Sequence, residues 1–213
     1  MKIRPEFWTL VLVGKWNKYI LVPDWVGTNI FKQKTVQVEF PLNLQGPPRF
    51  TNDEGDIRML PDDDRVIFVA VKNDEAILKK IEQMANDLLS ILPYTPISSF
   101  GENFGFIEET NLERILPLFE FPDNDSLSRK GCAIGKSSIR RTISKYPNTV
   151  LNFVMKQDGP KVIFDFNFHY LVKDAKEALE KITGSFIENK RRSEEFLREI
   201  YGLEYETEEE HDD

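Results

Sequence analysis

Candidate reactive groups are few in this sequence, and the first is a glycine-rich segment. GCAIGKSS (Gly131–Ser138) comes close to the phosphate-binding pattern G-x-x-x-x-G-K-[ST], in which backbone N–H groups surround a phosphate and the lysine neutralises it. The segment has one residue too few between its glycines, and the residues after it alternate like a strand where the pattern requires a helix. We therefore expect no nucleotide binding here and no cofactor elsewhere.

A possible proton-transfer pair is formed by His169 and Asp165. The two residues are four positions apart in an apolar run, which puts both side chains on one face of a strand. A histidine beside a carboxylate can move protons, but no nucleophile or third partner can be assigned to this pair. A hydrogen-bonded structural histidine is the favoured interpretation, and the sequence favours a protein with no catalytic residues.

Two further features indicate structure rather than chemistry. The run Asp62–Asp64 offers carboxylates of the kind that bind Mg²⁺ or Ca²⁺, but adjacent side chains in a turn do not converge, so a hairpin turn is favoured over a metal site. Cys132 is the single cysteine, which excludes an intramolecular disulfide and favours a reducing compartment. A nucleophilic role for it is not favoured, because the predicted strand context offers no helix N-terminus to activate a thiol.

The clearest functional signal is a concentration of positive charge in the second half. The segment Ser126–Gln157 holds seven basic residues and no acidic one, although the whole chain has a net charge of −8. Such a segment predicts a polyanion-binding surface. The candidate residues are Arg129, Lys130, Lys136, Arg140, Arg141 and Lys145. The competing interpretation is a solvent-exposed strand face, which the acidic character of the chain favours.

The tail Glu204–Asp213 balances this charge, because it carries seven carboxylates and no lysine or arginine. Like charges repel, and no apolar run in the tail could offset the entropy of ordering it. We therefore predict that the tail is disordered. We also predict that it shields the basic segment from polyanions.

Hydrophobic periodicity predicts the elements that carry these residues. Apolar residues from Ile77 to Leu92 recur at i, i+3 and i+4, which predicts a helix with Asn73 as its N-cap. A second helix is predicted over Asp174–Tyr201, with a kink at Gly184. Strands are predicted at Phe7–Val13, Val36–Leu42, Asp56–Leu60, Arg65–Val71, Thr95–Glu108, Gly131–Ser144, Thr149–Met155 and Lys161–Val172.

An internal repeat connects two of these regions. At a single offset, Met59 matches Met155 and Val66–Phe68 matches Val162–Phe164, and each copy precedes an amphipathic helix. We predict an α+β fold with internally duplicated strands-then-long-helix units, and with helices packed on one face of a largely antiparallel sheet. The polar segment Phe121–Arg129 is the predicted link. It divides the chain into residues 1–120 and 121–203, which share one core, followed by the tail 204–213.

Three segments carry a family resemblance. LPYTPISSFGENFGF (Leu92–Phe106), VGKWNKYILVPDWV near the start and the closing FIENKRRSEEFLREIYG resemble a sporadically distributed family of uncharacterised bacterial proteins. In that family, L-P-x-T-P-I and then G-x-N-F follow the first long helix. The resemblance implies a fold and a bacterial origin, and it brings no activity or catalytic residue.

These observations favour a non-enzymatic, cytoplasmic interaction or regulatory protein that acts through a protein partner or as a homo-oligomer. No stretch of about 18 consecutive apolar residues is present, so no membrane span is expected. Two alternatives remain open. One is nucleic-acid binding through the basic segment 126–157, and the other is small-ligand binding between the two halves.

Overall fold

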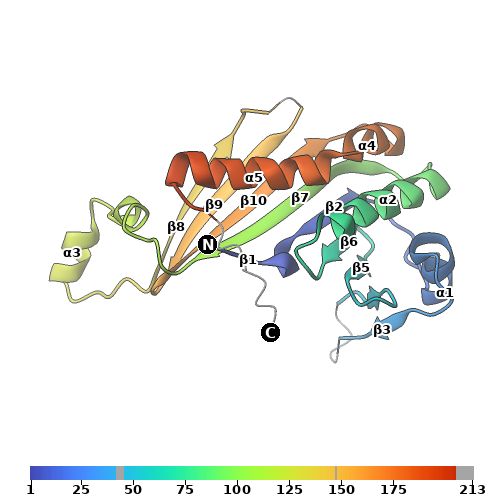
Figure 1. Ribbon diagram of the computed structural model, residues 1–213, viewed down its shortest axis with the longest axis horizontal. Helices are drawn as coiled ribbons and strands as arrows, with labels where there is room; N and C mark the ends of the chain where they lie inside the picture. The colour runs from blue at the N-terminus through green and yellow to red at the C-terminus, as the bar shows by residue number, and fades with distance from the viewer. Residues whose placement is uncertain (42–45, 147, 205–213) are drawn as a thin grey trace, which may run out of the picture.

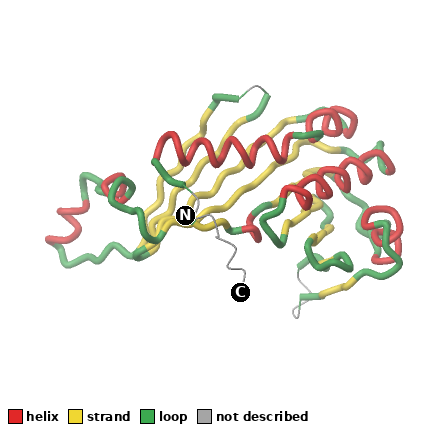
Figure 2. Tube along the Cα trace, viewed as in Figure 1, coloured by secondary structure: helices red, strands yellow, loops and turns green. Residues whose placement is uncertain are grey.

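A computed structural model describes residues 1–41, 46–146 and 148–204, and one antiparallel sheet extends through it (Figures 1 and 2). The strand order is β3-β4-β5-β6-β2-β7-β10-β9-β8, with β1 also paired to β7. The strands are β1 (Lys2–Ile3), β2 (Thr9–Gly14), β3 (Gln37–Glu39), β4 (Arg49–Thr51), β5 (Ile57–Pro61), β6 (Arg65–Ala70), β7 (Ile97–Glu108), β8 (Lys136–Ile143), β9 (Val150–Asp158) and β10 (Lys161–Leu171). The predicted α+β class and antiparallel sheet are confirmed.

The helices lie mainly on one face of this sheet. They are α1 (Pro23–Val26), α2 (Glu75–Ile91), α3 (Asn124–Arg129), α4 (Ala175–Ile182) and α5 (Ser185–Tyr201), with a π-helical turn η2 (Gly27–Phe31) and short 3₁₀ helices η1 (Pro5–Phe7) and η3 (Leu116–Phe119). Figure 1 shows α2, α4 and α5 over the same face. We call the opposite face of the sheet the open face.

Side-chain alternation explains why one face is covered. Along β10, Val162, Phe164, Phe166 and Phe168 are buried, whereas the residues between them are partly exposed. Successive strand side chains point to opposite faces, so the buried set packs under the helices and the other set lies on the open face. On the helix-covered face, the ring of Phe196 in α5 packs against the ring of Phe166, with 5.6 Å between the ring centroids.

The helix boundaries differ in two places from the prediction. The N-cap of α2 is Asp74, whose carboxylate accepts a 2.7 Å hydrogen bond from the Ala76 N–H, and Asn73 lies one residue earlier. The predicted kink at Gly184 is a break between α4 and α5, because this glycine has a φ of +79° that other residues rarely adopt. The Glu82 carboxylate of α2 accepts hydrogen bonds from the N–H groups of Gly184 and Phe186, which ties α2 to the start of α5.

The β5–β6 and β9–β10 hairpins share one register. Met59 pairs with Phe68 in the first hairpin, and Met155 pairs with Phe164 in the second, as the sequence repeat requires. The strand order also repeats about the β2–β7 pair, because β4-β5-β6-β2 on one side mirrors β8-β9-β10-β7 on the other. Both observations agree with a duplication, which remains a prediction.

The predicted link Phe121–Arg129 belongs to a projecting arm, residues 109–135, which connects β7 to β8 and contains η3 and α3. Figure 1 shows this arm extending beyond the sheet. The sheet continues through both flanking strands, and the repeated strand order favours a boundary near residues 92–96, between α2 and β7. The division at residue 121 therefore remains a prediction without support from the strand order.

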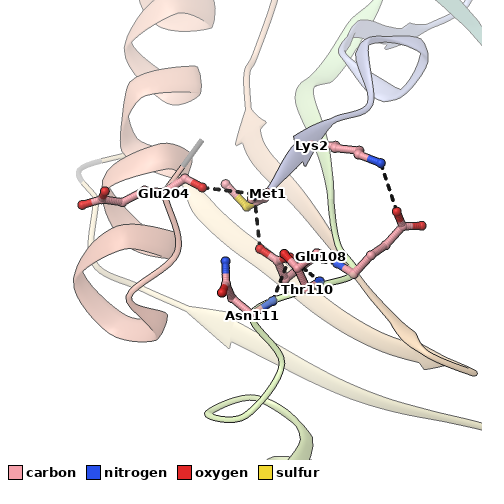
Figure 3. A network of polar contacts seen from close by, with 7 residues as sticks. Met1, Lys2, Glu108, Thr110, Asn111 and Glu204 are labelled. Atoms are coloured by element: carbon pink, nitrogen blue, oxygen red, sulfur yellow. Dashed lines mark hydrogen bonds and ion pairs between the residues drawn. The ribbon is translucent and has the colours of Figure 1, made fainter. Parts of the chain in front are cut away.

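A polar network joins the beginning and end of the described chain (Figure 3). The Met1 ammonium lies 3.3 Å from the buried Glu108 carboxylate and donates a 3.1 Å hydrogen bond to the Glu204 carbonyl. Burial alone would raise the pKa of Glu108. Hydrogen bonds from Thr110 and Asn111, together with the ammonium charge, outweigh burial and lower this pKa to about 2. The rest of the predicted tail, residues 205–213, lies outside the described residues.

Candidate interaction surface

The basic segment supplies β8, the edge strand of the sheet. Among the described strands, β8 pairs with β9 alone, so its other edge presents backbone N–H and C=O groups that no strand covers. Arg140 pairs with Val154 and lies on the open face, whereas Arg141 pairs with Phe153 and lies on the helix side. Both arginines are exposed. The strand therefore carries positive charge on both faces.

The structure distributes the six predicted polyanion-binding residues over three places. Arg129 and Lys130 lie at the end of α3 in the arm, and Lys145 lies beyond β8 with its ammonium 5.6 Å from the Tyr146 ring centroid. Lys136, at the start of β8, forms a 3.0 Å ion pair with Asp158 of β9. The two β8 arginines form no ion pair with any acid in the part of the chain that the structure describes.

Apolar side chains are exposed on the arm that precedes β8. Leu112, Ile115 and Phe119 anchor the arm in the core, and η3 contacts β8. Five large apolar side chains of the arm remain between 36% and 46% exposed, namely Leu116, Leu118, Phe121, Leu127 and Ile134. Exposed apolar groups gathered on one short segment are typical of protein-contact surfaces.

The predicted proton-transfer pair is not formed. His169 and Asp165 share the open face, but Asn167 lies between them, and four strand residues span about 13 Å. The Asp165 carboxylate instead forms a 2.5 Å ion pair with Lys156 of β9. His169 borders a separate hollow of about 390 Å³ at the far end of the strand. The separation of the two side chains follows from strand geometry alone, whereas the pairing of Asp165 with Lys156 depends on a neighbouring strand.

The other two sequence candidates have structural roles. Asp63 and Asp64 lie in the β5–β6 turn, where they pair with Lys18 at 2.7 Å and with Arg65 at 2.8 Å. The glycine-rich segment Gly131–Ser138 leads from α3 into β8, so no helix follows it to support a phosphate site. The hairpin turn at Asp62–Asp64 is observed, whereas the absence of nucleotide binding remains a prediction.

Sequence reasoning missed a buried acid, Glu102, in the middle of β7. Its side chain is fully buried, and it lies on the helix-covered face with Phe100 and Phe104. Burial raises the pKa of Glu102 to about 8, and hydrogen bonds from Ser185 and Asn189 only partly oppose this effect. The sequence did hold a signal for this residue, because Glu102 occupies a position in β7 where the alternation of side chains predicts an apolar residue.

The hydrogen bonds around Glu102 favour its neutral form. Ser185 has one hydroxyl proton, and its oxygen lies against both Glu102 and the Ile182 carbonyl. A protonated Glu102 donates to Ser185, which then donates to Ile182, so every group is satisfied. Asn189 donates to the other Glu102 oxygen at 2.6 Å and to the Tyr170 hydroxyl at 2.7 Å. The network fastens α5 to β7 and β10 and has a structural role.

Over residues 1–41, 46–146 and 148–204, the fold and this surface define an α+β protein with a ten-stranded antiparallel sheet, helices mainly on one face, and a basic edge strand beside an apolar arm. Within the described residues, no helix combines the length and apolar character needed to cross a membrane. No protein-family model matches the chain, and no curated protein matches it. The resemblance drawn from the three sequence segments is therefore neither supported nor opposed by these comparisons.

Proposed function

We propose that the protein is a non-enzymatic interaction protein that binds an extended, acidic segment of a partner protein along the free edge of β8. The observation that carries this proposal is the edge of an eight-residue strand with which no second described strand pairs. An added strand gains main-chain hydrogen bonds along such an edge, and side-chain contacts then select its sequence. The exposed Cys132 agrees with a reducing, cytoplasmic location, which we include in the proposal.

Charge favours an acidic partner over a second copy of this chain. Two β8 strands paired edge to edge would bring together three positive charges from each copy, with no acid in either strand. Like charges on paired strands are destabilising. Because Arg140 and Arg141 point to opposite faces, a partner strand with acids on both of its faces is the better match.

The arm supplies apolar contacts next to this edge. Arginine and aromatic side chains carry much of the binding energy in protein interfaces, and both are exposed here. Phe121, 38% exposed, is the largest of the exposed apolar side chains on the arm. The proposal therefore predicts a partner segment that is acidic where it follows β8 and apolar where it meets the arm.

The test is binding of a fluorescein-labelled peptide rich in valine and glutamate, measured by anisotropy. Hydrogen exchange should show new protection of β8 amides in the complex, because the added strand covers their outer edge. A control peptide of equal charge, with proline at every second valine, cannot pair as a strand and should bind much more weakly. Equal binding of both peptides, or no new protection in β8, would contradict the proposal.

Two variants locate the contact on the protein. Phe121→Ala should weaken peptide binding, whereas Tyr94→Ala, which removes a 96% exposed aromatic in the turn after α2, should leave it unchanged. An equal loss in both variants would mean that the arm has no special role.

Nucleic-acid binding by segment 126–157 remains the alternative prediction. The ion pairs of Lys136 and Lys156 with neighbouring aspartates reduce the free positive charge available for it. Binding to a single-stranded oligonucleotide would have to fall steeply as salt concentration rises. Absence of binding at low salt would remove this alternative.

A further inference from the structure

A row of polar side chains crosses the open face of the sheet. Thr9, Asn103, Asn167, Asn152 and Thr142 lie opposite one another on β2, β7, β10, β9 and β8. A continuous hydrogen-bond chain joins them. Thr142 donates to Asn152 at 3.3 Å, Asn152 to Asn167 at 3.0 Å, Asn167 to Asn103 at 2.7 Å, and Asn103 to Thr9 at 2.8 Å. The chain fixes the orientation of all three amides.

Each amide in this row retains hydrogen-bonding capacity. An asparagine side chain has two N–H donors and an oxygen with two lone pairs. Within the row, each of the three asparagines donates one hydrogen bond and accepts one. One N–H and one acceptor position therefore remain on each amide. Neighbouring amides are one strand spacing apart, about 4.8 Å.

Most of this row lies in a groove of about 610 Å³ on the open face. Phe7 forms one wall, where it packs closely against Gly105. A Cβ added at Gly105 would lie 2.7 Å from the Phe7 Cβ, so only glycine allows this approach. Phe7 is 43% exposed, and the Arg4 guanidinium carbon lies 3.7 Å from the centroid of its ring. Arg140 of β8 lines the opposite end.

One positive charge in the groove lacks a counter-charge. The Glu6 carboxylate lies 3.4 Å from Arg4, and the Asp165 carboxylate is paired with Lys156. Arg140 forms no ion pair among the described residues. The planar guanidinium group of arginine matches a carboxylate in charge and in hydrogen-bond geometry.

We propose that this groove binds a small carboxylate that carries amide groups, such as the C-terminal end of a short peptide. The ligand carboxylate pairs with the Arg140 guanidinium, and the ligand amides form hydrogen bonds with Asn103, Asn152 and Asn167. An apolar group at the other end of the ligand packs against Phe7. Arg140 and the Phe7 wall at Gly105 lie three strand spacings apart, about 14 Å, which an extended peptide of about four residues spans. The site lies on the open face, with lining residues from both sequence halves, and does not depend on the proposed use of the β8 edge.

The test is a titration of ¹⁵N-labelled protein with N-acetyl-triglycine, followed by NMR. The side-chain NH₂ signals of Asn103, Asn152 and Asn167 should shift and saturate together. N-acetyl-triglycine amide, which lacks the carboxylate, should bind about tenfold more weakly, because it cannot form a charge-assisted hydrogen bond with Arg140. Equal affinity for the acid and the amide would overturn the assignment of Arg140. Equal affinity for glucuronate, which has hydroxyls in place of amides, would overturn the choice of an amide-bearing ligand.

A matched pair of variants separates the groove from general electrostatics. Arg140→Gln and Arg141→Gln remove the same charge from adjacent, exposed residues on opposite faces of β8. Arg140→Gln should lower the affinity for N-acetyl-triglycine about tenfold, and Arg141→Gln should leave it unchanged. Equal losses would overturn the groove proposal. Equal losses would not contradict the β8-edge proposal, which expects both arginines to contribute to peptide binding and is tested separately.

Discussion

Replacing Glu102 with glutamine should reduce the fall in the free energy of unfolding between about pH 5 and pH 8. The pKa of Glu102 is about 8 in the folded protein, whereas the ordinary pKa of a glutamate is 4.5. Between these values the folded protein binds one more proton than the unfolded chain, so the free energy of unfolding falls as pH rises. The contribution is fully present below about pH 4.5 and is lost as pH rises through about 8.

The size of this effect follows from the same two values. Each tenfold change in proton affinity corresponds to about 1.4 kcal/mol, so ionising Glu102 in the folded state costs up to about 5 kcal/mol. Burial also raises the pKa of Glu82, so this residue too makes the free energy of unfolding fall as pH rises. The Glu102→Gln substitution would not remove this second contribution. Glu108, with a pKa of about 2, acts in the opposite direction and only at lower pH, because its contribution is lost as pH falls below about 4.5.

Glutamine is the informative replacement because it is neutral and has the shape of the protonated acid. Its amide N–H can donate to Ser185, and its oxygen can accept from Asn189. The assay is urea unfolding followed by tryptophan fluorescence at about pH 5, 6.5 and 8. Glu109→Gln is the control, since that side chain is 45% exposed and should leave the slope unchanged. Wild-type and Glu102→Gln proteins with the same pH slope would refute the reasoning, because Glu102 would then not hold a proton in the folded state.

Three further predictions follow from the core, the repeat and the tail. Ile81→Ala or Leu88→Ala should each reduce the free energy of unfolding by about 2–5 kcal/mol in urea titrations, because both side chains lie on the buried face of α2. Losses below about 0.5 kcal/mol at both would contradict this packing. Superposition of the two hairpin-and-helix units should make Val66–Phe68 equivalent to Val162–Phe164, and unlike positions relative to α2 and α4 would oppose a duplication. A protein ending at Glu204, which keeps the carbonyl that contacts the amino terminus, should retain its melting temperature and bind heparin more tightly at low salt, whereas unchanged heparin affinity would reject shielding by the tail.

Local patterns were sufficient for much of the fold. The i, i+3, i+4 spacing located α2, and the repeat that matched Met59 with Met155 anticipated the shared register of two hairpins. These features depend on residues that are close in sequence, so periodicity and turn chemistry record them. The N-cap was predicted one residue early because Asn73 and Asp74 are both good caps, and only the observed hydrogen bond to Ala76 distinguishes them.

The functional surfaces were decided by tertiary structure. Sequence identified a basic segment, but the pairing of β8 with β9 decided that Arg140 faces the groove and Arg141 faces the helix side. The asparagine row exists because five strands from distant parts of the chain meet in one register. His169 and Asp165 share one strand face as predicted, but they lie about 13 Å apart, and the neighbouring strand supplies Lys156 as the ion-pair partner of Asp165. Sequence therefore determined the elements and their buried faces through local alternation. The order of the strands and the partners of each charged side chain depend on contacts between distant segments, which local spacing does not encode.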